Sequence, residues 1–208
     1  MIYGASRTIF SSLILVSLMF VFGSFIGIIS GYIGGLFDNI VMRIVDVFLA
    51  FPSLVLAIAV AGVLGGGMIN AMIAIGVIGW TKYARLARGE VLEIKEETFI
   101  KAARLSGNSS MYIVFKHIMP RVLSTLIVTA SLDIGTTIME MAALSFLGLS
   151  SPLPIPEWGA MMNEGKSMIQ FAPWITIAPG IAIFIIVILF NLLGDVVHDM
   201  LDPKQKEY

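Results

Sequence analysis

Asp133 and Glu140 are the side chains best placed to do chemistry, because they lie seven residues apart in an otherwise largely apolar stretch. Seven residues are close to two turns of an α-helix, so both carboxylates lie on one helix face. Carboxylates at membrane depth are costly and usually face a bundle interior or a transport path. One interpretation is therefore a translocation path suited to a peptide amino terminus or a metal cation. An interhelical hydrogen bond to a neighbouring Ser, Thr or Asn is the open alternative.

Other chemistry-bearing residues are few. The chain has no cysteine, which excludes disulfides, thiolate metal sites and cysteine nucleophiles. A cluster near the end is interpreted as a solvated cytoplasmic exit rather than a metal site: Asp195, His198, Asp199 and Asp202. No G-x-x-x-x-G-K-[ST] motif occurs, so the chain cannot bind ATP through a P-loop. We therefore expect neither a metal site nor an enzyme.

The elements that position these residues are expected to be membrane-spanning helices. Of 208 residues, 58% are hydrophobic and only 13% are charged, about half the share of a soluble domain. The apolar runs lack the alternation of strands and are long enough to span a membrane as helices. Pro52 is expected to bend the second span, and Gly65–Gly67 to end it. The sequence thus predicts one all-α, polytopic transmembrane domain over residues 1–208 with about five spans, at 8–30, 47–64, 68–83, 121–147 and 174–194.

The distribution of basic residues predicts the orientation. Lys and Arg favour the cytoplasmic side, and placing the 82–121 segment inside leaves only Arg7 and Lys166 of the 13 outside. The C-terminus is then cytoplasmic and residues 148–173 form an extracytoplasmic loop. An odd number of spans puts the N-terminus outside, unless a further helix precedes it. The spacing of Gly23, Gly27 and Gly31 predicts a close helix-packing face on the first span.

Residues 84–120 are predicted to form a rigid cytoplasmic loop. A helix over 88–106 is expected to end at Gly107, where glycine adopts a left-handed cap without strain. Residues 108–110 offer N-caps for a second short helix, and Pro120 suits the first turn of the next span. Two interpretations remain open: an amphipathic helix at the lipid headgroups, or a docking element, which the small Ala102 and Ala103 favour.

The loop resembles the EAA loop of ABC-transporter permeases, on the residues "AARLSG" followed by nine residues and "HIMP". Lys101 stands where that family usually has Glu, and Met119 where it usually has Leu. The segments "GYIGGLFDNIVMRIVDVFLAFPSLVLAIAV", "GWTKYARLARGEVL" and "FNLLGDVVHDMLDP" are similar to the dipeptide/oligopeptide/nickel branch of the family, so the resemblance covers essentially the whole chain.

This resemblance implies a type I ABC importer permease fold in the cytoplasmic (inner) membrane, with a coupling loop that docks on an ATPase. The loop residues expected to dock or flank the contact are Phe99, Ala102, Ala103, Arg104 and Gly107. ATP and Mg would be bound by partner subunits, with no cofactor in this chain. The implied partners are a second homologous permease, two ATPases, an extracytoplasmic binding protein and the lipid bilayer, with no nucleic acid.

The implied function is import of di- or oligopeptides or nickel, free or chelated; the residues do not decide the substrate. A stand-alone secondary transporter or channel is the alternative, but such carriers have inverted internal repeats and we find no convincing repeat.

Overall fold

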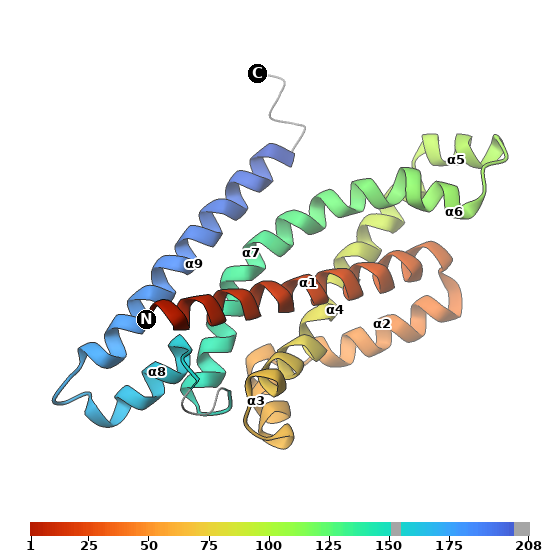
Figure 1. The fold of residues 1–208 in the computed structure, drawn as a ribbon. Helices are drawn as coiled ribbons and strands as arrows, with labels where there is room; N and C mark the ends of the chain where they lie inside the picture. The colour runs from red at the N-terminus through yellow and green to blue at the C-terminus, as the bar shows by residue number, and fades with distance from the viewer. Residues whose placement is uncertain (151–154, 202–208) are drawn as a thin grey trace.

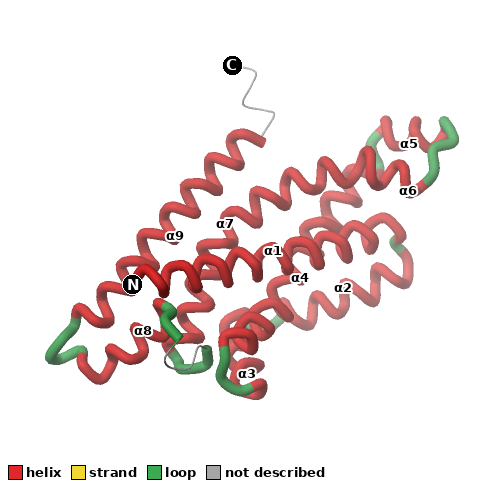
Figure 2. Tube along the Cα trace, in the orientation of Figure 1, coloured by secondary structure: helices red, strands yellow, loops and turns green. Residues whose placement is uncertain are grey.

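The computed structural model describes residues 1–150 and 155–201, and these residues are helical with no strand among them (Figure 2). The helices are α1 (Ile2–Ile33), α2 (Gly35–Leu49), α3 (Ser53–Leu64), α4 (Met68–Lys95), α5 (Thr98–Leu105), α6 (Ser110–Ile113), α7 (Met119–Phe146), α8 (Trp158–Gly165) and α9 (Trp174–Leu201). A π-helical turn, Val114–Ile118, joins α6 to α7, and a 3-10 turn, Lys166–Met168, follows α8. The predicted all-α fold is confirmed.

The long helices lie side by side, with α5 and α6 together at one end of the bundle and α3 and α8 towards the other (Figure 1). The N-terminus lies beside α8, where the indole Nε1 of Trp158 donates a hydrogen bond to the carbonyl of Met1 at 3.2 Å. At the opposite end, Lys95 Nζ of α4 donates to the carbonyl of Tyr32 in α1 at 2.9 Å. Helices α1 and α4 therefore run in the same direction.

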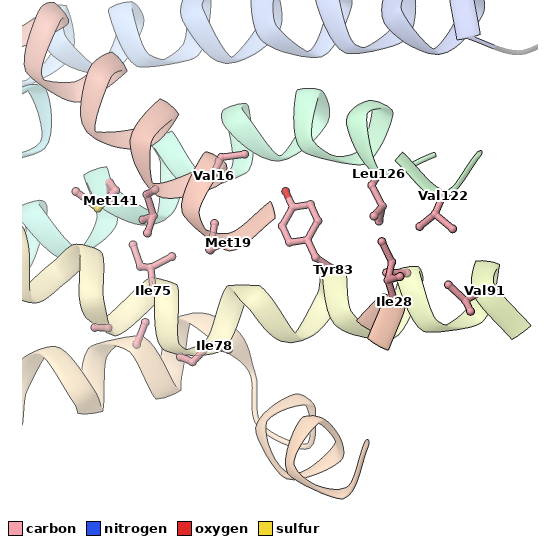
Figure 3. Close-up of a cluster of buried hydrophobic side chains, with 14 of the residues drawn as sticks. Val16, Met19, Ile28, Ile75, Ile78, Tyr83, Val91, Val122, Leu126 and Met141 are labelled. Atoms are coloured by element: carbon pink, nitrogen blue, oxygen red, sulfur yellow. The ribbon is translucent and has the colours of Figure 1, made fainter. Parts of the chain in front are cut away.

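The core forms where α1, α4 and α7 meet, and Figure 3 shows Tyr83 of α4 between Met19 of α1 and Leu126 of α7. Gly23 and Gly27 make this approach possible, because a Cβ at either position would lie 2.3 Å from a carbonyl oxygen of α4. Gly31 faces Val91 one turn further on. The predicted glycine packing face is confirmed.

Pro52 breaks the second span as expected, because α2 and α3 meet at 89° across it. The bent pair begins with α2 at Gly35 instead of residue 47. The chain turns where α1 meets α2, at Gly34 and Gly35, which have φ of +69° and +64°. Within residues 1–150 and 155–201, three helical stretches are long and apolar enough to be spans, or four with the bent pair, against about five predicted. Helix α4 was predicted to contain the remaining span, but it does not meet these criteria, because its second half carries several basic residues.

The helix expected over 88–106 is wrong as a single element. Helix α4 continues to Lys95, the chain turns at Glu96–Glu97, and α5 follows. The remaining local predictions hold. Gly107 ends α5 with φ +81°, and the Ser109 hydroxyl caps α6 by accepting from the backbone N–H of Tyr112 at 3.3 Å. Pro120 lies in the first turn of α7.

Candidate functional site

A charged cavity of about 280 Å³ opens between α3, α4 and α7. Asp133 and Glu140 both line it, which places the two predicted carboxylates on one face of α7 as their spacing requires. Lys82 reaches the same cavity from α4 and Ser53 from the start of α3, with Ile75 and Ile78 among its apolar lining. The cavity is therefore a mostly apolar space with three ionisable groups, the Ser53 hydroxyl and three threonines.

The two carboxylates have different partners. Lys82 Nζ lies 2.6 Å from Asp133 Oδ1, and the Asp133 side chain is only 13% exposed. Glu140 Oε1 accepts a hydrogen bond from Ser53 Oγ at 3.2 Å. Across residues 1–150 and 155–201, no cation lies within 4 Å of Glu140. If all three groups are ionised, the cavity holds one carboxylate in excess of its lysine.

Three basic residues at three-residue intervals run from this cavity along α4: Lys82, Arg85 and Arg88. At 100° per residue each step turns the stripe by about 60°, so it passes from the side facing α7 to the side facing α2. Each member has a carboxylate partner: Lys82 pairs with Asp133 of α7, and Arg85 with Asp46 of α2.

Arg88, the last member of the stripe, makes its ion pair with Asp38 of α2. It donates through Nε and Nη2 to the two carboxylate oxygens, both at 2.6 Å. Ser30 of α1 also donates to Asp38, at 2.7 Å, and Asp38 is only 6% exposed. This buried network joins α1, α2 and α4 just before the α5–α6 segment.

The sequence interpretation missed Lys82 and Ser53 as parts of the cavity. Lys82 was assigned to the cytoplasmic segment, because the third span was expected to end near residue 83. In the structure α4 is one helix to Lys95, so Lys82 lies in its middle and faces α7. The sequence signal for this was the repeat of basic residues at every third position, Lys82, Arg85 and Arg88. In the structure each of them pairs with a carboxylate of a neighbouring helix.

The α5–α6 segment protrudes from the end of the bundle (Figure 1). Ala102, Arg104 and Gly107 are exposed, and the neighbouring Leu105 is 91% exposed although it is apolar. The other two predicted loop residues, Phe99 and Ala103, are partly buried against the core. The structure thus divides the five residues into an outer and an inner group.

The segment is anchored to the bundle at its base. Arg121 donates through Nη1 to both oxygens of Glu97, at 2.9 and 3.0 Å, and its guanidinium carbon lies 4.5 Å from the centre of the Phe99 ring. Ile100 of α5 is fully buried. These contacts fix the base of the α5–α6 segment to the helix bundle.

At the opposite end, Glu157 is nearly fully buried and caps α8. Burial raises the pKa of its carboxyl, and hydrogen bonds from the Ser145 hydroxyl and the Gly159 N–H act in the opposite direction. The next residue, Trp158, donates its backbone N–H to Thr8 Oγ1 of α1 at 3.3 Å. Glu157 therefore belongs to the contacts that tie α8 to α7 and α1.

The C-terminal acidic cluster is exposed where it is described, with His198 Nδ1 3.5 Å from Asp199 Oδ1; Asp202 lies outside the described residues. The described parts of the chain hold no group of three or more side chains that could bind a metal ion.

Comparison with known families gives a match over residues 23–207 to the model described as "Binding-protein-dependent transport system inner membrane component". The chain is 43% identical over 205 residues to the dipeptide transport system permease protein DppC of Alkalihalophilus pseudofirmus, covering 99% of this chain and 67% of that one. It is 46% identical over 184 residues to the glutathione transport system permease protein GsiD of Pectobacterium atrosepticum, covering 88% and 61%. The chain thus spans roughly two thirds of the length of these relatives.

The fold is similar to that of a chain in inward-facing structures of the MetNI methionine ABC transporter. One crystal form gives a TM-score of 0.72 at 21% identity over 97% of this chain and 98% of that chain, and a second gives 0.75 at 20% identity over 97% and 95%. At this identity the likeness concerns the fold alone.

Proposed function

Because this chain belongs to the family of binding-protein-dependent transport system inner membrane components, we propose that it is the permease subunit of an ATP-driven importer of di- or oligopeptides, or of nickel. Permease subunits of this family are multi-pass inner-membrane proteins, and they are neither enzymes nor cofactor-binding proteins. The proposed partners are a second permease, two ATPase subunits and an extracytoplasmic binding protein. The C-terminus is proposed to be cytoplasmic, like the α5–α6 loop.

The cavity that holds Asp133 and Glu140 is the observation that carries this proposal. Ionisable groups at membrane depth are costly, and they mark substrate paths when they face a cavity. The names of the relatives, with dipeptide and glutathione, support a peptide substrate. Lys82 also favours a peptide over a bare divalent cation, because its ammonium already neutralises Asp133.

Uptake into proteoliposomes tests the path. We expect Asp133→Asn to lower ATP-driven uptake of a tripeptide about 10-fold, whereas Asp46→Asn, which removes an exposed partner of Arg85 outside the cavity, leaves it near the wild-type rate. Unchanged uptake with Asp133→Asn would remove the cavity from the path. Uptake of nickel but of no peptide would reassign the substrate, and uptake that needs no ATP would favour a stand-alone carrier.

The α5–α6 segment is proposed to dock on the ATPase through its outer group, Ala102, Arg104 and Gly107, together with the exposed Leu105. Phe99 and Ala103 of α5 would position the helix by packing against the core. In a pull-down from membranes that contain all subunits, Gly107→Pro should lose the ATPase, because proline cannot adopt the φ of +81° found there. Gly107→Asn is the matched control, since asparagine tolerates this conformation and should retain the ATPase. Equal recovery with both variants would contradict docking through this turn.

A further inference from the structure

The charged groups of the cavity are arranged as two separate poles. Lys82 and Asp133 form one pole, at 2.6 Å from each other. Glu140 forms the other, two helical turns further along α7, with only the Ser53 hydroxyl as its hydrogen-bond partner among the described side chains. Helix α7 is continuous through both positions, so the rise between them is about 10 Å at 1.5 Å per residue.

The two poles offer opposite charges to a ligand. Glu140 has no counter-ion within 4 Å in the part of the chain that the structure describes, so an ammonium group would compensate a carboxylate at membrane depth. Among the described residues that line the cavity, Lys82 is the one cation. Its side chain is 56% exposed, whereas Asp133 beside it is 13% exposed, so the ammonium is open to a second carboxylate.

The separation of the poles sets the length of a ligand that contacts both. An extended peptide spans about 3.3–3.6 Å per residue, which gives about 7 Å for two residues and about 10 Å for three. Five residues would span about 17 Å and extend beyond one pole. A dipeptide or tripeptide lying along α7 therefore fits the rise between Glu140 and Asp133, the partner of Lys82.

We propose that this cavity binds short linear peptides with both termini free, the amino terminus at Glu140 and the carboxylate at Lys82. The inference rests on the proposed function and adds a substrate class and a direction to it. Asp133 is then a positioning residue: it holds Lys82 at its pole when no peptide is bound. The Ser53 hydroxyl holds the Glu140 carboxylate in the same way, from the start of α3.

Binding to the intact transporter in lipid nanodiscs, without the binding protein, tests this directly. The probe is radiolabelled trialanine in equilibrium dialysis, with N-acetyl-trialanine, trialaninamide and pentaalanine as competitors. We expect each capped peptide to bind at least 10-fold more weakly than trialanine, which corresponds to about 1.4 kcal/mol, and pentaalanine to bind more weakly as well.

Two variants assign the poles. Glu140→Gln should weaken trialanine about 10-fold but leave the N-acetyl peptide as it is in the wild type, because that peptide has no ammonium to lose. Lys82→Gln should likewise weaken trialanine about 10-fold. It should leave the binding of trialaninamide as it is in the wild type, because that peptide has no carboxylate to lose. Arg85→Gln is the matched control, since it removes a paired cation of α4 one turn away, outside the cavity, and should leave the binding of trialanine unchanged.

Three results would overturn the proposal. The caps could have no effect on binding, or each variant could weaken capped and uncapped peptides equally, as a general structural defect would. Trialanine could also fail to bind the wild-type transporter. In this last case, ATP-driven peptide uptake with the binding protein present would leave the proposed function standing while the two-pole site fails.

Discussion

Replacing Gly27 by alanine should separate α1 from α4. A Cβ at this position would lie 2.3 Å from the carbonyl oxygen of Ala84 and 2.8 Å from the Cβ of Ala87. Ordinary contact begins at 3.4 Å, so the helices must move apart by about 1.1 Å. Overpacking of this kind costs about 1–3 kcal/mol, and we expect the upper end, because backbone cannot rotate away as a side chain can. Gly31→Ala should cost less, since its nearest atom lies at 3.0 Å.

Unfolding of the purified protein by SDS in mixed micelles measures this loss of stability. Gly89→Ala is the matched control: Gly89 lies inside a helix as Gly27 does, here α4, but it is exposed and has no atom within 4 Å of the added Cβ. There alanine should be neutral or stabilise by up to about 1 kcal/mol through helix propensity. If Gly27→Ala unfolds like Gly89→Ala, the close α1–α4 contact does not exist in the protein.

Three further predictions concern local contacts. Asp38→Asn should destabilise by about 2–3 kcal/mol in the same SDS assay, because it leaves Arg88 half-buried without its carboxylate, and the double variant with Arg88→Gln should recover part of the loss. Glu157 has a raised pKa in the folded protein, so its stabilising contribution is complete below its unfolded pKa of about 4.5 and is lost as pH rises through the folded value. The unfolding free energy of the wild type relative to Glu157→Gln should therefore fall between about pH 4 and pH 8. A constant difference would contradict the burial of Glu157. Ser109→Ala should remove the α6 cap at a cost of about 1 kcal/mol, seen as roughly 5-fold faster hydrogen exchange at the Tyr112 amide.

Much of the fold follows from local sequence signals. Gly107 and Pro52 mark a turn and a bend that depend on backbone chemistry alone, so they were predictable without knowledge of neighbouring helices. The three glycines of α1 were predictable as a packing face, although the sequence did not indicate that α4 is the partner. The end of α4 was not predictable from hydropathy, because the helix continues for three turns beyond its apolar part. Three of its basic residues, Lys82, Arg85 and Arg88, pair with carboxylates of α2 and α7, which is a tertiary effect.

The candidate site, too, could be predicted from the sequence only where its residues share one helix. The carboxylates Asp133 and Glu140 share a helix, so a spacing of seven was enough to place them together. Lys82 comes from another helix, and only the register of α4 against α7 brings its ammonium to Asp133 instead of the cytoplasmic surface. Helix α1 packs against both α4 and α7, and Gly23 and Gly27 set how closely it lies against α4. A substitution at Gly27 should therefore weaken trialanine binding as well as stability, since it moves α4 and Lys82 relative to α7. Loss of stability with fully retained trialanine affinity would mean that the Lys82 pole does not depend on this packing.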